Sequence, residues 1–448
     1  MVLTKWCLAQ LFFGFLAEVQ STKVALEFES IRKQAAAIRM EIIAWRRELH
    51  RQPELMYQEY NTSKFIQEAL KDMGVSFTTG WSRNTHQDRI PGLGGTGVVA
   101  EIGTGRPPVV ALRTDIDALP IHEETPVPFR SEHDGRMHAC GHDGHASMLL
   151  GAAKLLKDHA EMMPGTVRLI FQPAEEGGAG AARMKEEGVL KDVFRIFGLH
   201  LWPGLPSGTI GGRAGITMAA GDMFELHIVG QGAHGAMPHQ GVDPITAAAA
   251  VIQSLQTIVS RETDPQDAAV VSVTKMHAGD AFNVIPAVAV IGGTIRSLST
   301  SGLDMLRTRL VEVVKTVAMA HKCSVERIQF MPDYFPATNN DPELWSWLES
   351  SEAGIKQSAE SPPMHWHLRP TMGGEDFAFY AKEVPGAFIF LGQGTDQGEH
   401  LDDFPTNKSL HSPRFNMDES VLDLGTALHT HLALQSLLAL NLSPPLEL

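Results

Sequence analysis

From residue 27 to about residue 70, apolar positions recur every three or four residues, with Arg and Glu between them. This period predicts an amphipathic helix, which Pro53 ends. Asn61-Thr-Ser63 can cap a second predicted helix over residues 64–73. The apolar positions of the first helix are Ile38, Ile42, Trp45 and Leu49.

Beyond residue 73 the pattern changes to short β-branched runs bounded by glycine and proline. Residues 145–159 (HASMLLGAAKLLKDH) predict a helix between two of these runs. Strands that alternate with helices predict an α/β fold, a mostly parallel sheet with helices on both faces. The predicted strands cover residues 98–102, 109–112, 167–171 and 194–199.

A different pattern begins near Met218 and predicts an inserted α+β module, ferredoxin-like in its mixture of elements. After it, helix and strand patterns alternate again. We therefore expect one α/β domain in two parts, 27–217 and 332–440, interrupted by the inserted domain at 218–331. Within the insertion, strands are predicted over 224–229, 270–277, 288–296 and 323–330, and helices over 244–260 and 302–321.

Length and composition agree with a globular protein of more than one domain. The chain has 448 residues, too many for a single hydrophobic core. Its 43% hydrophobic and 20% charged residues exclude a disordered or fibrous chain. The net charge of −15 argues against a nucleic-acid binder, and three cysteines are too few for a disulfide framework.

The first 21 residues resemble a secretory signal peptide, because Lys5 precedes the apolar run 6–17. The alternative is an amphipathic or buried N-terminal helix. A signal peptide at 1–21 predicts the secretory pathway or the extracellular space, and the alternative predicts the cytoplasm. The run is too short to span a bilayer, so we expect no membrane span.

Residues that can ligate metal ions cluster at several predicted strand ends. Residues 137–145 (MHACGHDGH) hold three histidines, a cysteine and an aspartate. Cys140 and His142 can point the same way in an extended backbone, and a thiolate with an imidazole suits an ion such as zinc. In open α/β sheets such strand-end residues share one edge. The other candidates there are Asp115, Asp117, Glu175, Glu176 and His200, with His411 in a later loop.

Glu175 and Glu176 are adjacent, and neighbouring side chains at a strand end point to different sides. One carboxylate can therefore bind a metal ion while the other acts as a general base toward water. A metal ion lowers the pKa of water and polarises a carbonyl group. This combination predicts a hydrolase.

Eight motifs together resemble those of the dimer-forming, two-metal amidohydrolases. That family includes hippurate hydrolases, N-acyl-amino-acid hydrolases and plant auxin–amino acid conjugate hydrolases. The motifs follow the order of the family from about residue 35 to residue 438, which makes the resemblance highly specific. They are RTDIDALP at 113–120, MHACGHDGH at 137–145, QPAEE at 172–176, GLH at 198–200, GAHGAMPH at 232–239, NVIP at 283–286, MGGEDF at 372–377 and LH at 410–411.

The resemblance implies two divalent metal ions, which could be zinc, manganese, cobalt or nickel. It also implies that Glu175 is the general base and that Asp115 supports the ligands from behind. Related peptidases have a histidine ligand where this chain has Arg113, and Cys140 is then the compensating ligand. The implied metal ligands are Cys140, His142, Glu176, His200 and His411.

The inserted domain resembles the lid of the family, which also forms the contact of a homodimer. His234 matches a residue that reaches the active site of the partner subunit and helps hold the developing oxyanion. Asn283 and Arg296 match residues that hold the carbonyl and the carboxylate of the substrate. Gly235 stands where the family usually has alanine. The implied substrate is an N-acyl amino acid, hippurate-like or auxin-conjugate-like, cleaved at its amide bond.

Two alternatives belong to other classes of function. A papain-like cysteine amidase would use Cys140 as its nucleophile, with a lowered thiol pKa and no metal. A non-catalytic relative would bind acyl-amino acids but would normally have lost a ligand or the base. The additional Glu and His donors argue against the first, and the presence of Glu175 with all five ligands argues against the second.

Overall fold

The computed structural model describes residues 27–350, 353–355, 362–394 and 404–442. The predicted signal peptide at 1–21 lies outside these residues. Among the helices of the described ranges, none is both long and apolar enough to cross a membrane.

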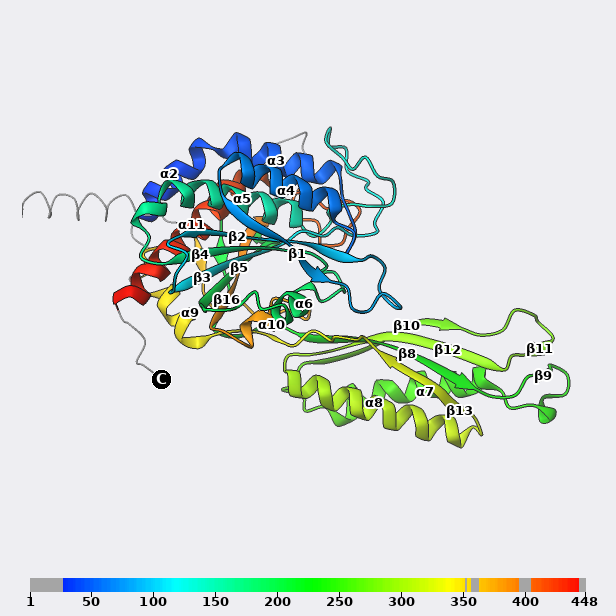
Figure 1. Ribbon diagram of the computed structural model, residues 1–448. Helices are drawn as coiled ribbons and strands as arrows, with labels where there is room; N and C mark the ends of the chain where they lie inside the picture. The colour runs from blue at the N-terminus through cyan, green and yellow to red at the C-terminus, as the bar shows by residue number, and fades with distance from the viewer. Residues whose placement is uncertain (1–26, 351–352, 356–361, 395–403, 443–448) are drawn as a thin grey trace, which may run out of the picture. The chain divides into compact units, whose positions relative to one another are not determined.

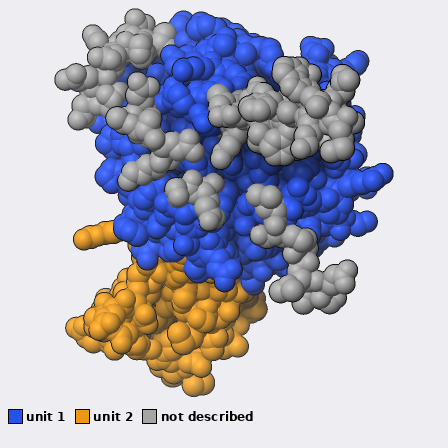
Figure 2. All heavy atoms as spheres, turned by 90° about the vertical axis from the view of Figure 1, so that its left-hand side faces the viewer, with its two compact units in different colours: residues 1–214, 340–368, 380–448 blue, residues 215–339, 369–379 orange. Residues whose placement is uncertain are grey.

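The chain forms two compact units, coloured blue and orange in Figure 2. Unit 1 contains residues 1–214, 340–368 and 380–448. Unit 2 contains residues 215–339 and 369–379. The sequence predicts an interrupted domain with its boundaries near 217 and 332, and unit 1 is likewise built from separate stretches of the chain.

Unit 1 is built on an eight-stranded sheet with the order β1-β2-β4-β3-β5-β16-β6-β15. The central strands β4, β3, β5 and β16 run parallel, and β1 and β2 add an antiparallel edge. The predicted α/β fold with a mainly parallel sheet is confirmed. The strands are β1 (Ser76–Arg83), β2 (Gly94–Gly103), β3 (Val109–Asp115), β4 (Thr166–Gln172), β5 (Val193–Pro206), β6 (Ile210–Gly211), β15 (Met364–His365) and β16 (Gly386–Gly394).

Helices lie on both faces of this sheet (Figure 1). α5 and α11 pack on β3, whereas α6 packs on β1 and β4 from the opposite side. Every residue of β3 is buried, as expected for a strand covered on both faces. The helices are α2 (Phe28–Ala37), α3 (Arg39–Arg51), α4 (Tyr60–Asp72), α5 (His142–Asp158), α6 (Gly180–Glu186), α9 (Pro342–Glu349) and α11 (Leu422–Leu442), and along the chain α10 (Ala378–Ala381) contains the division between unit 2, which ends at residue 379, and unit 1.

The start of α4 differs from the prediction. The helix begins at Tyr60, and no side-chain cap comes from its own N-cap residue. Instead, the Glu54 carboxylate accepts hydrogen bonds from Thr62 N and Asn61 Nδ2, each over 2.9 Å. A carboxylate upstream of the helix accepts a hydrogen bond from an N–H group that has no partner within the helix. The helix can therefore begin before the predicted cap at residues 61–63.

Unit 2 has a four-stranded antiparallel sheet in the order β10-β12-β8-β13, packed against α7 and α8. Its core includes Leu226, Val251, Ile291 and Leu310, all buried. A two-stranded ribbon, β9 with β11, extends it. The elements are β7 (Gly215–Met218), β8 (Ala220–Val229), β9 (Ala233–His234), α7 (Pro244–Thr257), η3 (Ile258–Glu262), β10 (Ala269–His277), β11 (Val284–Ile285), β12 (Val288–Ser297), α8 (Thr300–Ala320), β13 (Ser324–Phe330) and β14 (Thr338–Asn340).

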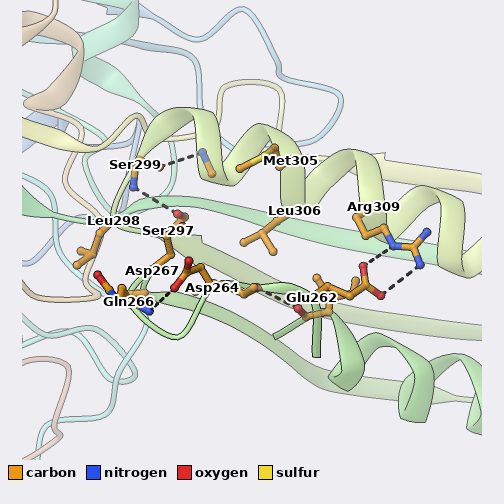
Figure 3. Close-up of a pocket in the computed structure, with 15 residues that line it drawn as sticks. Glu262, Asp264, Gln266, Asp267, Ser297, Leu298, Ser299, Met305, Leu306 and Arg309 are labelled. Carbon is orange, nitrogen blue, oxygen red and sulfur yellow. Dashed lines mark hydrogen bonds and ion pairs between the residues drawn. The ribbon is translucent and has the colours of Figure 1, made fainter. Parts of the chain in front are cut away.

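A cavity of about 540 Å³ opens on unit 2 between η3 and the first turns of α8 (Figure 3). Its wall combines apolar side chains, such as Leu306, with the acidic residues Asp264 and Asp267. Arg309 and Glu262 also line it and form an exposed ion pair with a 2.6 Å Nε–Oε2 distance. None of the site residues predicted from the sequence lines this cavity.

Candidate metal centre

Three neighbouring strands of unit 1 bring candidate ligands to one edge of the sheet. β3 ends at Asp115, and β4 ends at Gln172, shortly before Glu175 and Glu176. His200 lies in β5, which pairs with β3 on the side opposite β4. Asp115, Glu175 and Glu176 therefore lie at or just beyond the carboxyl ends of adjacent parallel strands, whereas His200 lies within β5, which continues to Pro206 beyond the predicted strand 194–199.

Cys140 and His142 reach the same edge through a turn, and not through the extended backbone that the sequence suggested. Gly141 between them has φ of +92°, in the left-handed region that favours glycine. His142 is then the first residue of α5. Both side chains are buried, and Cys140 Sγ lies 3.6 Å from His200 Nε2.

All five predicted metal ligands gather in unit 1. Cys140, His142 and His200 form one group, and Cys140, Glu176 and His411 form a second, each with its donor atoms within 4.8 Å of one another. The two groups share the Cys140 sulfur. Thiolate, imidazole and carboxylate donors at these separations match the ligand types that divalent transition metals take.

Buried polar atoms at the centre also fit a bound cation. Within the described part of the chain, His142 Nε2 is buried and makes no hydrogen bond. A buried polar atom of this kind costs stability unless it is satisfied. His142 Nδ1 lies 2.8 Å from the Asp117 carbonyl oxygen and His200 Nδ1 lies 2.8 Å from the Leu201 carbonyl oxygen. Each ring that donates from Nδ1 presents Nε2 as a lone-pair donor.

Asp117 supports two candidate ligands at once. Its backbone carbonyl orients His142, and its Oδ2 accepts a hydrogen bond from Glu176 N over 2.9 Å. The sequence marks Asp117 as a strand-end carboxylate but assigns it no role. The signal for that role was its place two residues after Asp115, directly beyond the end of β3.

Asp115 is held firmly on both sides. Its Oδ1 lies 2.6 Å from His145 Nδ1, and its Oδ2 accepts from Arg113 Nη1 over 3.0 Å. His145 Nε2 in turn accepts a hydrogen bond from Leu201 N over 2.9 Å. His145 therefore links Asp115 to the strand of His200, a role that the sequence did not reveal. Its signal was the spacing of three from His142, which puts both rings on one side of α5.

The charges at the centre favour a positive group. Burial by itself would lower the pKa of His142, but the carboxylates of Asp115 and Asp117 outweigh burial and raise that pKa to about 10. Burial lowers the pKa of His200 well below its usual range, and His145 lowers it further. A neutral imidazole at His200 is the form that binds metal.

The thiol at Cys140 has the opposite of the environment that a cysteine nucleophile needs. Burial raises the pKa of Cys140 well above its usual range, and the carboxylates of Glu176 and Glu175 raise it further. Reactive cysteines instead sit near positive charges that lower the thiol pKa. The surroundings of Cys140 therefore argue against the cysteine-amidase alternative, which needs a lowered thiol pKa without a metal ion.

The three residues matched to the lid lie in unit 2. His234 is exposed in β9, and Val284, the neighbour of Asn283, pairs with it across the ribbon. Gly235 N donates to the Asn283 carbonyl oxygen over 2.7 Å. Arg296 lies near the other end of β12, where its Nη1 donates to the Ile295 carbonyl oxygen over 3.0 Å. The structure thus brings His234 and Asn283 together and places Arg296 apart from them on the same unit.

Comparison with known proteins agrees with this centre. Residues 111–435 match the peptidase family M20/M25/M40. The chain is 41% identical to an IAA-amino acid hydrolase of Arabidopsis thaliana over 89% of this chain and 86% of the relative. It is 38% identical to an N-acetyl-L-cysteine deacetylase of Bacillus subtilis over 89% of each chain.

A solved structure shares the fold as well. The crystal structure of a dinuclear metal-binding M20 peptidase from Bacillus subtilis matches with a TM-score of 0.70 and 36% identity. The match covers 90% of this chain and 99% of that one. The protein described here belongs to the peptidase family M20/M25/M40 and is a metal-dependent hydrolase of its amidohydrolase type.

Proposed function

We propose that this protein hydrolyses the amide bond of N-acyl amino acids, with Glu175 as the general base. The observation that carries the proposal is the position of Glu175, which is 6% exposed and whose carboxylate lies within 4.8 Å of donor atoms of His142 and Glu176. Relatives named for hydrolysis of IAA-amino acids and deacetylation of N-acetyl-L-cysteine support this substrate class. Hippurate-like and auxin-conjugate-like substrates both belong to it.

Two divalent ions, held by the two groups that share Cys140, would complete the centre. Zinc, manganese, cobalt and nickel all accept this mixture of sulfur, nitrogen and oxygen donors. When bound, such ions lower the pKa of water and polarise the carbonyl of the substrate. The name of the dinuclear relative supports the number of ions.

Glu175 moves the proton in the proposed reaction. Its carboxylate accepts a proton from the attacking water and delivers it to the amine nitrogen that leaves the acyl carbon. Asp115 serves by position, because both of its oxygens are engaged by His145 and Arg113. It therefore fixes the positions of the side chains beside the metal ligands.

The lid residues would hold the substrate. Arg296 suits the α-carboxylate because a guanidinium binds a carboxylate through two hydrogen bonds, and Asn283 and His234 suit the acyl carbonyl. We also propose a homodimer through unit 2. Phe282 is fully exposed in the loop before β11, and Val284 of β11 is half-exposed. Apolar side chains exposed in this way favour coverage by a partner.

A single substitution tests the base. Glu175→Gln keeps the shape of the side chain but removes its ability to accept a proton, so kcat should fall by at least about 100-fold. Metal content should stay unchanged, as read by metal analysis after dialysis. Turnover at the wild-type rate on a panel of acetyl, benzoyl and indole-acetyl amino acids would refute the assignment.

Metal removal separates the proposal from the cysteine-amidase alternative. A chelator should abolish hydrolysis, and each of the four candidate ions should be tested for its restoration. Cys140→Ser should weaken metal retention, because the thiolate belongs to both donor groups. Hydrolysis that survives chelation but is lost in Cys140→Ser would favour the thiol nucleophile instead.

A further inference from the structure

A strained turn carries the proposed base and the neighbouring ligand. Ala174 directly precedes Glu175 and Glu176, and its φ is +60°. This is the left-handed region, which an alanine avoids because its Cβ crowds the backbone there. Such a conformation persists only where the surroundings hold it in place. The direction of the two glutamates therefore depends on what fixes Ala174.

The Glu59 carboxylate makes the contact that fixes this turn. Ala174 N donates to Glu59 Oε1 over 2.9 Å, and Tyr57 N donates to the same oxygen over 2.8 Å. Tyr57 is left-handed as well, with φ of +60°. Thr96 Oγ1 bonds the second oxygen over 2.7 Å. One wholly buried carboxyl group, whose pKa is raised to about 8 by burial and by the charge of Asp117, thus joins two left-handed residues from distant parts of the chain.

The segment after the glutamates is held against the same group. The Tyr57 hydroxyl donates to the Gly178 carbonyl oxygen over 2.6 Å, and Gly180 N donates to the Ala174 carbonyl oxygen over 3.1 Å. A Cβ added at Gly178 would meet Ala174 Cβ at 2.6 Å and Tyr57 Cε2 at 2.7 Å. Both ends of the turn are therefore fixed, and the Glu59 carboxyl group is the side chain that holds its first residue, Ala174.

We propose that Glu59 is a positioning residue for the hydrolysis, which orients Glu175 and Glu176 by holding Ala174 in its left-handed conformation. Glu59 bonds the backbone ahead of the two glutamates, and acts on substrate and metal only through them. The inference rests on the proposed function, because the group that it orients is the proposed general base.

Three substitutions together test this role. Glu59→Ala should lower kcat about 100-fold with little change in KM, because a displaced base slows the chemistry more than substrate binding. It should also speed metal loss in dialysis, since Glu176 shifts with the turn. Glu59→Gln keeps an oxygen for both amides and should stay within a few-fold of wild type. Adding Ala174→Gly to Glu59→Ala should restore at least tenfold in kcat, because glycine adopts the turn without strain.

A matched control separates positioning from general loss of stability. Leu437→Ala removes a buried core side chain from α11 and should lower thermal stability with kcat and metal retention unchanged. If Glu59→Ala does not fold, Glu59→Asp withdraws the acceptor by one methylene and takes its place in the comparison with Ala174→Gly.

The outcomes are distinct. Wild-type kcat and metal retention in Glu59→Ala would overturn the inference, and so would a failure of Ala174→Gly to restore either of them. A wild-type protein that hydrolyses no N-acyl amino acid would refute the proposed function instead. In that case the metal retention of the Glu59 and Ala174 variants would still report whether the turn is held as described.

Discussion

Two arginines in different units make ion pairs of similar length in opposite surroundings. In unit 1, Arg46 is 1% exposed, with Nε 3.0 Å from Asp143 Oδ2 and Nη1 3.2 Å from Glu419 Oε1. In unit 2, Arg309 pairs with Glu262 at 2.6 Å (Figure 3) and with Glu312 at 2.9 Å, and all three side chains are exposed. Water can replace a lost partner only at the surface. Burial, and not distance, should therefore decide which pair the protein depends on.

The buried pair also connects the fold to the candidate metal centre. Arg46 on α3 joins Asp143, in the first turn of α5, to Glu419, just before α11. His50 Nδ1 lies 2.7 Å from the same Asp143 Oδ2. Asp143 directly follows His142, so the start of the helix that carries this ligand is held by the network. The same residues therefore support both the stability of the fold and the geometry of the candidate metal centre.

The largest effect should come from breaking the buried network. Arg46→Ala leaves Asp143 and Glu419 buried without their shared cation, and should lower the free energy of unfolding by about 3–5 kcal/mol. Arg47→Ala is the matched control, because Arg47 pairs with the same Glu419 but is 31% exposed. It should cost about 1 kcal/mol or less. Urea denaturation measures both, and equal losses would remove burial as the explanation.

A buried histidine should make the stability of unit 1 depend on pH. Burial in α11 lowers the pKa of His429 to about 3, with a smaller contribution from His145. The unfolded value is about 6.5, so the stabilising contribution is complete above that pH and is lost as the pH falls toward 3. Between pH 7.5 and pH 5 the loss from this group should be about 2 kcal/mol.

His429→Leu should remove this part of the pH dependence, because leucine cannot take up the proton. Urea denaturation of both proteins at pH 7.5 and pH 5 measures the difference. If wild type and variant lost the same stability on acidification, His429 would not be the group responsible.

The sequence predicts the donors of the metal centre better than it predicts what holds them. Glu176 and His200 can be found because their side-chain types and their places after strand patterns both point to metal, and Cys140 can be found because it lies in a cluster of histidines just before a predicted helix. In the sequence, Arg46 is only one of the polar residues between the apolar positions of α3. Its burial depends on Glu419, which is 373 positions away in the chain, and no local pattern reports a partner at that distance.

Turns explain the remaining differences between prediction and structure. Cys140 and His142 converge through Gly141, whose left-handed backbone replaces the extended segment suggested by their spacing. Ala174 takes the same kind of conformation without being a glycine, so the sequence contains no turn signal for it. At Ala174 a contact from another segment, the hydrogen bond to Glu59, holds the backbone, and local propensity cannot anticipate it.

The smallest effect should come from the exposed pair. Arg309→Ala should leave the midpoint of unfolding and kcat unchanged within error, because water and salt already screen these charges and the long side chain regains its freedom. Leu306→Ala is the matched control, since Leu306 lines the same cavity on α8 but is buried. It should cost about 2–5 kcal/mol. A loss in Arg309→Ala as large as that in Leu306→Ala would show that an ion pair of this length stabilises the protein even in water, and would remove the contrast with Arg46.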